Sequence, residues 1–124
     1  MLNNEGQAAE AVTLLSAVSA ANTAAATSGW IDVRKYEGDL VFVVNTGAIT
    51  GTNTITVEDA TDSGGTGAAA VTPNETVAVI NSANQIRKFT VNASAVRGWV
   101  RLVGTIVTGP NLISATLLAR PKYV

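Results

Sequence analysis

Short stretches of β-branched and aromatic residues recur along this chain, and turn-forming residues separate them about every eight to twelve positions. Thr52–Glu58 alternates strictly, with Ile55 and Val57 on one side and threonines and Glu58 on the other. Trp99–Val107 alternates in the same way. This pattern is typical of antiparallel sheets packed as a sandwich or barrel.

We therefore expect an all-β fold, an antiparallel β-sandwich of jelly-roll type with about eight strands. The continuous apolar run Leu40–Val44 predicts a central strand that is buried on both faces. The expected strands are Val12–Val18, Trp30–Arg34, Leu40–Val44, Thr52–Glu58, Thr76–Ile80, Ile86–Val91, Trp99–Val107 and Leu112–Ala119.

Gly, Asn, Asp and Pro mark the expected connections between these strands. A long loop is predicted over 59–69, and a short helical turn over 92–96 with Asn92 as its cap. Turns are expected at Glu37–Asp39, Asn81–Asn84 and Gly109–Asn111, and a further loop is expected to begin at Asn45–Gly47 and to be closed by Gly51.

The N-terminal part permits two interpretations. Residues 1–10 are polar and predict an extended arm or a disordered tail. Residues 7–28 are rich in Ala, which favours a helix, but 12–18 also fits a strand, and the β pattern of the rest favours the strand. We expect 1–27 to be an arm with this Ala-rich segment, and 28–124 to be the sandwich domain.

The C-terminal segment 120–124 is expected to be an extended tail, because Pro121 lacks the N–H that would continue a ladder. Such a cationic peptide can add to a neighbour's sheet or cross a subunit boundary. A frayed terminus is the simpler alternative.

Catalysis is not expected, because the chain has no Cys and no His. The usual nucleophile–histidine arrangements are therefore impossible within one chain. No cofactor and no metal site are predicted: the acidic loop Glu58–Ser63 lacks the spacing of a calcium-binding loop and fits a solvated hairpin. The carboxylates of Asp32, Glu37 and Asp39 are more simply explained by ion pairing or exposure.

Charged residues make up 14% of the chain, and the net charge is -1. Nucleic acid is not an expected partner, since no basic footprint exists. A membrane is not expected either, because no apolar run approaches the roughly 20 residues of a spanning helix. The N-terminus also lacks the basic region of a signal peptide. A surface with so few charges suits packing against another protein.

Trp30 and Trp99 are candidate functional residues, because each follows a glycine and begins an expected strand that contains an arginine. A ring at the end of a sandwich most simply plugs the core, but it can also anchor a protein interface or stack on a sugar. The candidate interface residues, including those of the tail, are Trp30, Arg34, Trp99, Arg101, Arg120, Lys122 and Tyr123.

Three stretches resemble small capsid-decoration (cement, or head-stabilising) proteins of tailed bacteriophages. The similarity extends over about residues 27–124 and lies in the order and style of the motifs, with no catalytic signature. The stretches are GWIDVRKYEGDL at 29–40, GWVRLVGT at 98–105 and LLARPKY at 117–123.

This resemblance implies a β-sandwich, often a jelly roll, that binds the outside of a phage capsid and stabilises it by bridging neighbouring major capsid protein subunits. It further implies a homotrimer on the virion surface, made in the host cytoplasm and without an active site. Two alternatives remain open: another virion subunit, such as a small jelly-roll coat or tail protein, and a carbohydrate-binding sandwich. The latter needs several exposed aromatic residues, and aromatic residues are 5% of the chain.

Overall fold

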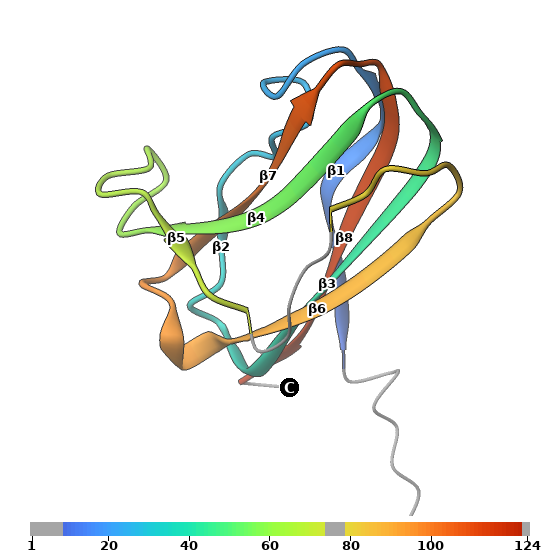
Figure 1. The fold of residues 1–124 in the computed structure, drawn as a ribbon. Helices are drawn as coiled ribbons and strands as arrows, with labels where there is room; N and C mark the ends of the chain where they lie inside the picture. Colours follow the sequence, from blue (N-terminus) through green and yellow to red (C-terminus); the bar gives the residue numbers. More distant parts are fainter. Residues whose placement is uncertain (1–8, 74–78, 123–124) are drawn as a thin grey trace, which may run out of the picture.

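The computed structural model describes residues 9–73 and 79–122 and contains two antiparallel four-stranded sheets. The predicted β-sandwich is confirmed (Figure 1). Within the described residues the strands are β1 (Glu10–Ala20), β2 (Ile31–Asp32), β3 (Tyr36–Ile49), β4 (Thr52–Ala60), β5 (Ala69–Val71), β6 (Ile86–Asn92), β7 (Trp99–Val107) and β8 (Asn111–Pro121), and a 3-10 turn, η1 (Ala93–Ala95), follows β6.

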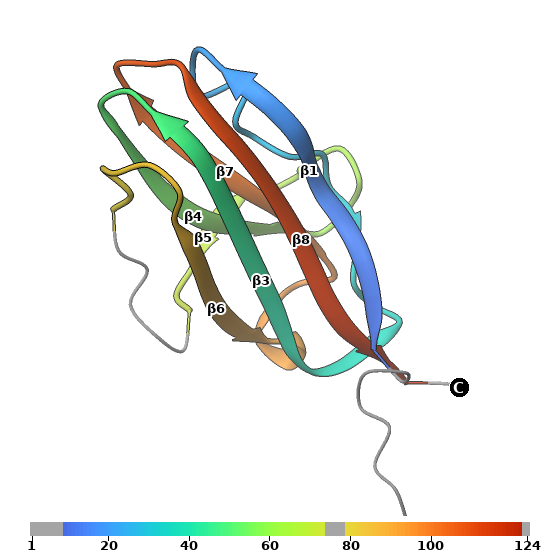
Figure 2. The same cartoon turned by 90° about the vertical axis from the view of Figure 1, so that its right-hand side faces the viewer.

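The strand pairing is that of a long hairpin folded over on itself. β4 pairs with β5 at its tip, then β3 with β6, β2 with β7, and β1 with β8, all antiparallel. Successive pairs fall alternately in the two sheets, which gives a first sheet ordered β1-β8-β3-β6 and a second ordered β2-β7-β4-β5. This order is a jelly roll, as the sequence predicts. Figure 2 shows the first sheet facing the viewer.

The core lies between the two sheets. Phe42 and Phe89 stand directly opposite on β3 and β6, and their rings stack with centroids 5.2 Å apart. On β3, Leu40 and Val44 are also fully buried, whereas Val41 is half-buried. The prediction that this strand is buried on both faces is therefore wrong, because a two-layer sandwich covers one face of each sheet.

β3 continues through the turn predicted at Glu37–Asp39 and through the predicted start of the next loop at Asn45–Gly47, so these two predictions are wrong. At Gly38, whose φ is +73°, the register against β8 shifts between Glu37 and Val41 and the strand continues through a bulge. At Gly47 the chain stays extended, and a Cβ there would come within 3.2 Å of the Leu112 side chain. The turn to β4 contains Gly51, with φ +75°, so the expectation that this glycine closes the loop is confirmed.

The Ala-rich segment forms β1, so the interpretation of this segment as a strand is confirmed and its interpretation as a helix is wrong. β1 pairs with β8 along its length, and Leu14 enters the core.

The C-terminal tail also differs from expectation. β8 runs to Pro121, Arg120 lies opposite Glu37, and the Lys122 N–H donates to the Lys35 carbonyl at 2.8 Å. Pro121 is tolerated because it is the last residue of the strand.

The remaining elements follow the sequence with smaller differences. The predicted strands at 52–58, 86–91 and 99–107 are confirmed, and Asn92 caps η1 by accepting the Ser94 N–H at 2.9 Å. The strand expected at Trp30–Arg34 shrinks to the two residues of β2, and β5 forms at the end of the predicted long loop. The expected turn at Gly109–Asn111 ends one residue early, since Asn111 already belongs to β8.

Two expectations fall partly outside the described residues. The N-terminal arm, up to residue 8, is one of them. Most of the strand expected at Thr76–Ile80 is the other, although Ile80 itself forms a two-bond bridge with Asn53 of β4. In the part of the chain that is described, no helix has the length and apolar character needed to cross a membrane.

Candidate binding surface on the second sheet

Four of the sequence-predicted interface residues lie together on the outer face of the second sheet, and we call them the Trp–Arg surface: Trp30, Arg34, Trp99 and Arg101. Strand alternation places them there. In β7, Val100 and Leu102 point into the core, which directs Trp99 and Arg101 outward. Their partners across the ladder in β4, which share the outer face, are Ala60 and Glu58.

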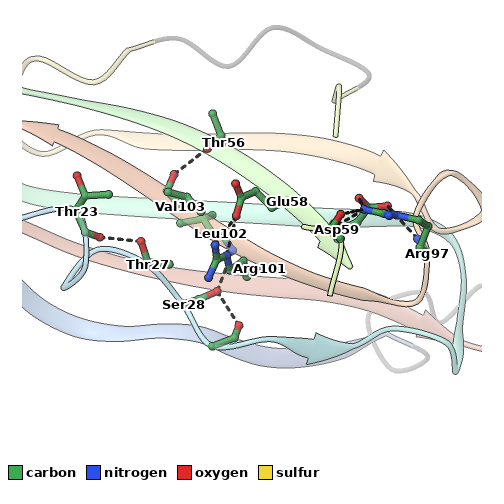
Figure 3. Close-up of polar contacts among 12 residues, drawn as sticks. Thr23, Thr27, Ser28, Thr56, Glu58, Asp59, Arg97, Arg101, Leu102 and Val103 are labelled. Atoms are coloured by element: carbon green, nitrogen blue, oxygen red, sulfur yellow. Dashed lines mark hydrogen bonds and ion pairs between the residues drawn. The ribbon is translucent and has the colours of Figure 1, made fainter. Parts of the chain in front are cut away.

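Arg101 is the centre of the first half of this surface. Its Nε donates to Glu58 Oε1 at 2.8 Å, and its terminal nitrogen lies 2.6 Å from the same oxygen (Figure 3). The guanidinium carbon also lies 4.6 Å from the ring centroid of Trp30, a cation–π distance. The carboxylate and the ring together hold the arginine in one orientation.

Trp30 reaches this position because the preceding segment docks on β7. The N–H of Ser28 donates to the Leu102 carbonyl, and Ser28 Oγ accepts the Leu102 N–H at 2.9 Å (Figure 3). The ring also lies against the β4–β5 loop at Gly65. A Cβ at Gly65 would lie 2.8 Å from the indole nitrogen, and its φ of +81° also requires glycine.

Arg34 and Asp32 form the second half, beside Trp99. Arg34 donates to both carboxylate oxygens of Asp32, at 2.9 and 2.7 Å, and its guanidinium carbon lies 5.5 Å from the Trp99 ring centroid. Hydrogen bonds from the Arg34 side chain are the main reason that the pKa of Asp32 falls to about 2. The pair is solvent-accessible, with exposed side-chain fractions of 67% and 38%.

A third ion pair between an arginine and a carboxylate, which the sequence analysis missed, lies at the end of the second sheet. Asp59 is buried and accepts the backbone N–H and two side-chain nitrogens of Arg97, the shortest at 2.8 Å (Figure 3). Arg97 also donates to the carbonyl of Gly67. These hydrogen bonds lower the pKa of Asp59. Asp59 belongs to β4 and not to the loop in which the sequence analysis placed it.

The interpretation of the two Trp residues as core plugs is wrong. Both are half-buried on the outer face, and neither belongs to the hydrophobic core. The core is filled instead by Tyr36, Phe42 and Phe89. Trp99 is one residue out of phase with the buried Val100, a signal already present in the alternation of β7.

The cationic residues of the C-terminal segment do not join the Trp–Arg surface. Arg120 lies on β8 of the first sheet, and Lys122 lies beside Tyr36 and η1 at the end of the sandwich where β8 finishes. Tyr123 lies outside the described residues.

The side chains of the Trp–Arg surface belong to types that are common in protein interfaces. Aromatic rings and guanidinium groups are the side chains most enriched at the energetic centres of protein interfaces. The acidic residues nearby are used in pairing or turns: Glu58 with Arg101, Asp59 with Arg97, and Asp62 as acceptor for the Gly64 and Thr66 N–H groups. Among the residues described, no group of three potential ligands could hold a metal ion.

Comparison of the sequence with protein-family models and with curated proteins gives no match. Among solved structures, the chain resembles the crystal structure of the SPBc2 prophage-derived protein YomS with a TM-score of 0.54. The two sequences are 10% identical, and the match covers 89% of this chain and 92% of that one. At this identity the likeness shows a shared fold across nearly the whole of both chains.

Proposed function

We propose that this chain is a structural protein of a bacteriophage particle that binds the outside of the capsid and stabilises the shell. The Trp–Arg surface carries the proposal: two half-buried Trp rings and two ordered arginines on a rigid sheet form a ready-made contact for another protein. The jelly-roll fold, the sequence resemblance to decoration proteins and the fold likeness to a prophage-derived protein support it.

The stabilising mechanism would be a linkage effect. A protein that binds the assembled shell and not its separated subunits stabilises the assembly by about 1.4 kcal/mol for each tenfold excess of free protein over Kd. A rigid sandwich that contacts two neighbouring shell subunits would transmit this free energy to the joint between them. The role requires no catalytic residue and no cofactor.

A carbohydrate-binding role is the alternative of another class, and the geometry of the rings weighs against it. Sugar stacking needs an open aromatic face, whereas Arg101 lies over Trp30 and Arg34 lies over Trp99. The guanidinium groups would have to move before a pyranose ring could stack.

The test is co-sedimentation of the purified protein with expanded and unexpanded empty shells of the phage that encodes it, together with shell melting. We expect binding to shells and a raised melting temperature. We expect Trp99→Ala to weaken binding by about 30-fold or more, while Val107→Ala, an exposed apolar residue on the same strand, leaves it unchanged. Absence of binding to either shell, with retention on a glycan array, would overturn the proposal.

A further inference from the structure

The β4–β5 loop, residues 61–68, projects from the second sheet and is closed by Asp62 (Figure 1). The side-chain Oδ1 of Asp62 accepts the N–H groups of Gly64 at 2.9 Å and Thr66 at 3.2 Å. Its carbonyl accepts the Gly65 N–H at 3.1 Å. Hydrogen bonds from Thr66 are the main reason that the pKa of Asp62 lies below its ordinary value. Glycine permits many backbone conformations, and in this glycine-rich loop the carboxylate selects one of them.

Arg97 ties the far end of the loop to the second sheet. Its Nη2 donates to the Gly67 carbonyl at 2.7 Å and to Asp59 Oδ1 of β4 at 2.8 Å (Figure 3). Every residue of the loop is exposed except Gly65, which is half-buried. The loop is therefore fixed at two places, and one point between them is turned toward the rest of the protein.

That half-buried point, Gly65, lies against the Trp30 ring. A Cβ at Gly65 would lie 2.8 Å from the indole nitrogen and 3.0 Å from two ring carbons, which is closer than a side chain allows. The Arg101 guanidinium carbon lies 4.6 Å from the centroid of the same ring. The loop backbone and Arg101 therefore both contact Trp30, and a shift of the loop would remove one of the two contacts.

We infer that Asp62 is a positioning residue for Trp30: by closing the β4–β5 loop it keeps the Gly65 backbone against the indole and the ring in the orientation that Arg101 contacts. A side chain that is already ordered does not have to be ordered when a partner binds, and this favours affinity. The consequence for binding rests on the proposed function, whereas the positioning of the ring does not.

Nitrogen-15 relaxation of the Trp30 indole N–H in the full chain tests the positioning role, and Trp99→Phe assigns the two indole signals. We expect an order parameter of about 0.85, typical of a rigid group, which falls below about 0.6 in Asp62→Ala because two loop N–H groups lose their acceptor. Asp62→Asn keeps an acceptor oxygen and should restore most of the order. Asp39→Ala removes an exposed carboxylate from β3 of the first sheet and is the matched control, with an unchanged order parameter.

Circular dichroism and the urea midpoint establish that each variant is folded. An order parameter that Asp62→Ala leaves unchanged would overturn the inference. So would an equal loss of order in Asp39→Ala, or a loss that Asp62→Asn does not restore.

Co-sedimentation of the same variants with empty shells tests the consequence for binding. We expect Asp62→Ala to bind about three- to tenfold more weakly, and Asp62→Asn to bind nearly as the native protein does. If the native protein binds no shell, the proposed function fails, while the relaxation data still decide whether Asp62 positions the ring. A loosened Trp30 ring with unchanged affinity for shells would overturn the step from positioning to binding.

Discussion

Asp59 and Asp32 are both aspartates held by an arginine on the second sheet, yet their surroundings differ. The side chain of Asp59 is 8% exposed and accepts three hydrogen bonds from Arg97, while that of Asp32 is 38% exposed beside a largely solvated Arg34. Glu58 and Arg101 lie between these extremes, at 27% and 31%. The same ion-pair chemistry therefore occurs at three degrees of burial.

This gradient separates a pair that stabilises the fold from pairs that solvent can reach. Removing one member of a buried pair leaves an uncompensated polar group in a region of low dielectric, which is costly. An exposed pair contributes little to folding, because water and salt screen it. We therefore assign Asp59–Arg97 to holding the end of the sandwich, and the half-buried Glu58–Arg101 and exposed Asp32–Arg34 pairs to orienting the Trp–Arg surface.

Asp59→Asn is expected to have the largest effect. The amide keeps the volume but removes the charge that accepts the Arg97 hydrogen bonds, and because Arg97 itself is 42% exposed and stays partly hydrated, we expect the free energy of unfolding to fall by about 1–2 kcal/mol. Urea denaturation followed by Trp fluorescence measures this, with an unchanged m-value. The pKa of Asp59 is lowered in the folded protein, so its contribution is present above the unfolded pKa and is lost as pH falls through the folded pKa. If Asp59→Asn lowered the free energy of unfolding by less than Asp32→Asn does, burial would not determine how much each pair stabilises the fold.

Arg101→Gln is expected to have an intermediate effect. It removes the ion pair with Glu58 and the contact with the Trp30 ring, which together predict a loss of about 1 kcal/mol. Loss of the cation also changes the surroundings of Trp30, so its emission should shift in the folded protein. Arg87→Gln, which changes an arginine of the first sheet, is the control and should leave the emission unchanged. If the fluorescence emission of Arg101→Gln were unshifted, the Trp30 ring would not be in contact with the Arg101 guanidinium.

The sequence predicts most of the fold because alternation and turn residues act locally. It fails at β3, where the bulge at Gly38 and the packing of Gly47 against Leu112 let a strand pass through residues that usually end one. Both features depend on β8, which lies far away in the sequence. No local pattern contains that information.

The site was predictable in part for the same reason. Alternation in β7 places Trp99 and Arg101 on one face, but the pairing of Arg101 with Glu58 requires the register of β4. Asp59 was assigned to a loop because Asp and Gly follow it, whereas the hydrogen bonds of Arg97 keep it in the strand and out of solvent. A buried carboxylate becomes recognisable once its arginine is placed beside it.

Asp32→Asn is expected to have the smallest effect on stability and the clearest pH dependence. At pH 7 we expect a loss below about 1 kcal/mol, since the pair is exposed. The pKa of Asp32 is lowered to about 2 in the folded protein, so the folded state binds fewer protons than the unfolded state as the pH falls from about 4 to 2. The contribution of the carboxylate is complete above that window and is lost within it. The difference in urea midpoint between the two proteins should therefore shrink towards zero at pH 2, and a difference that persists there would show that Asp32 stabilises the fold by something other than its charge.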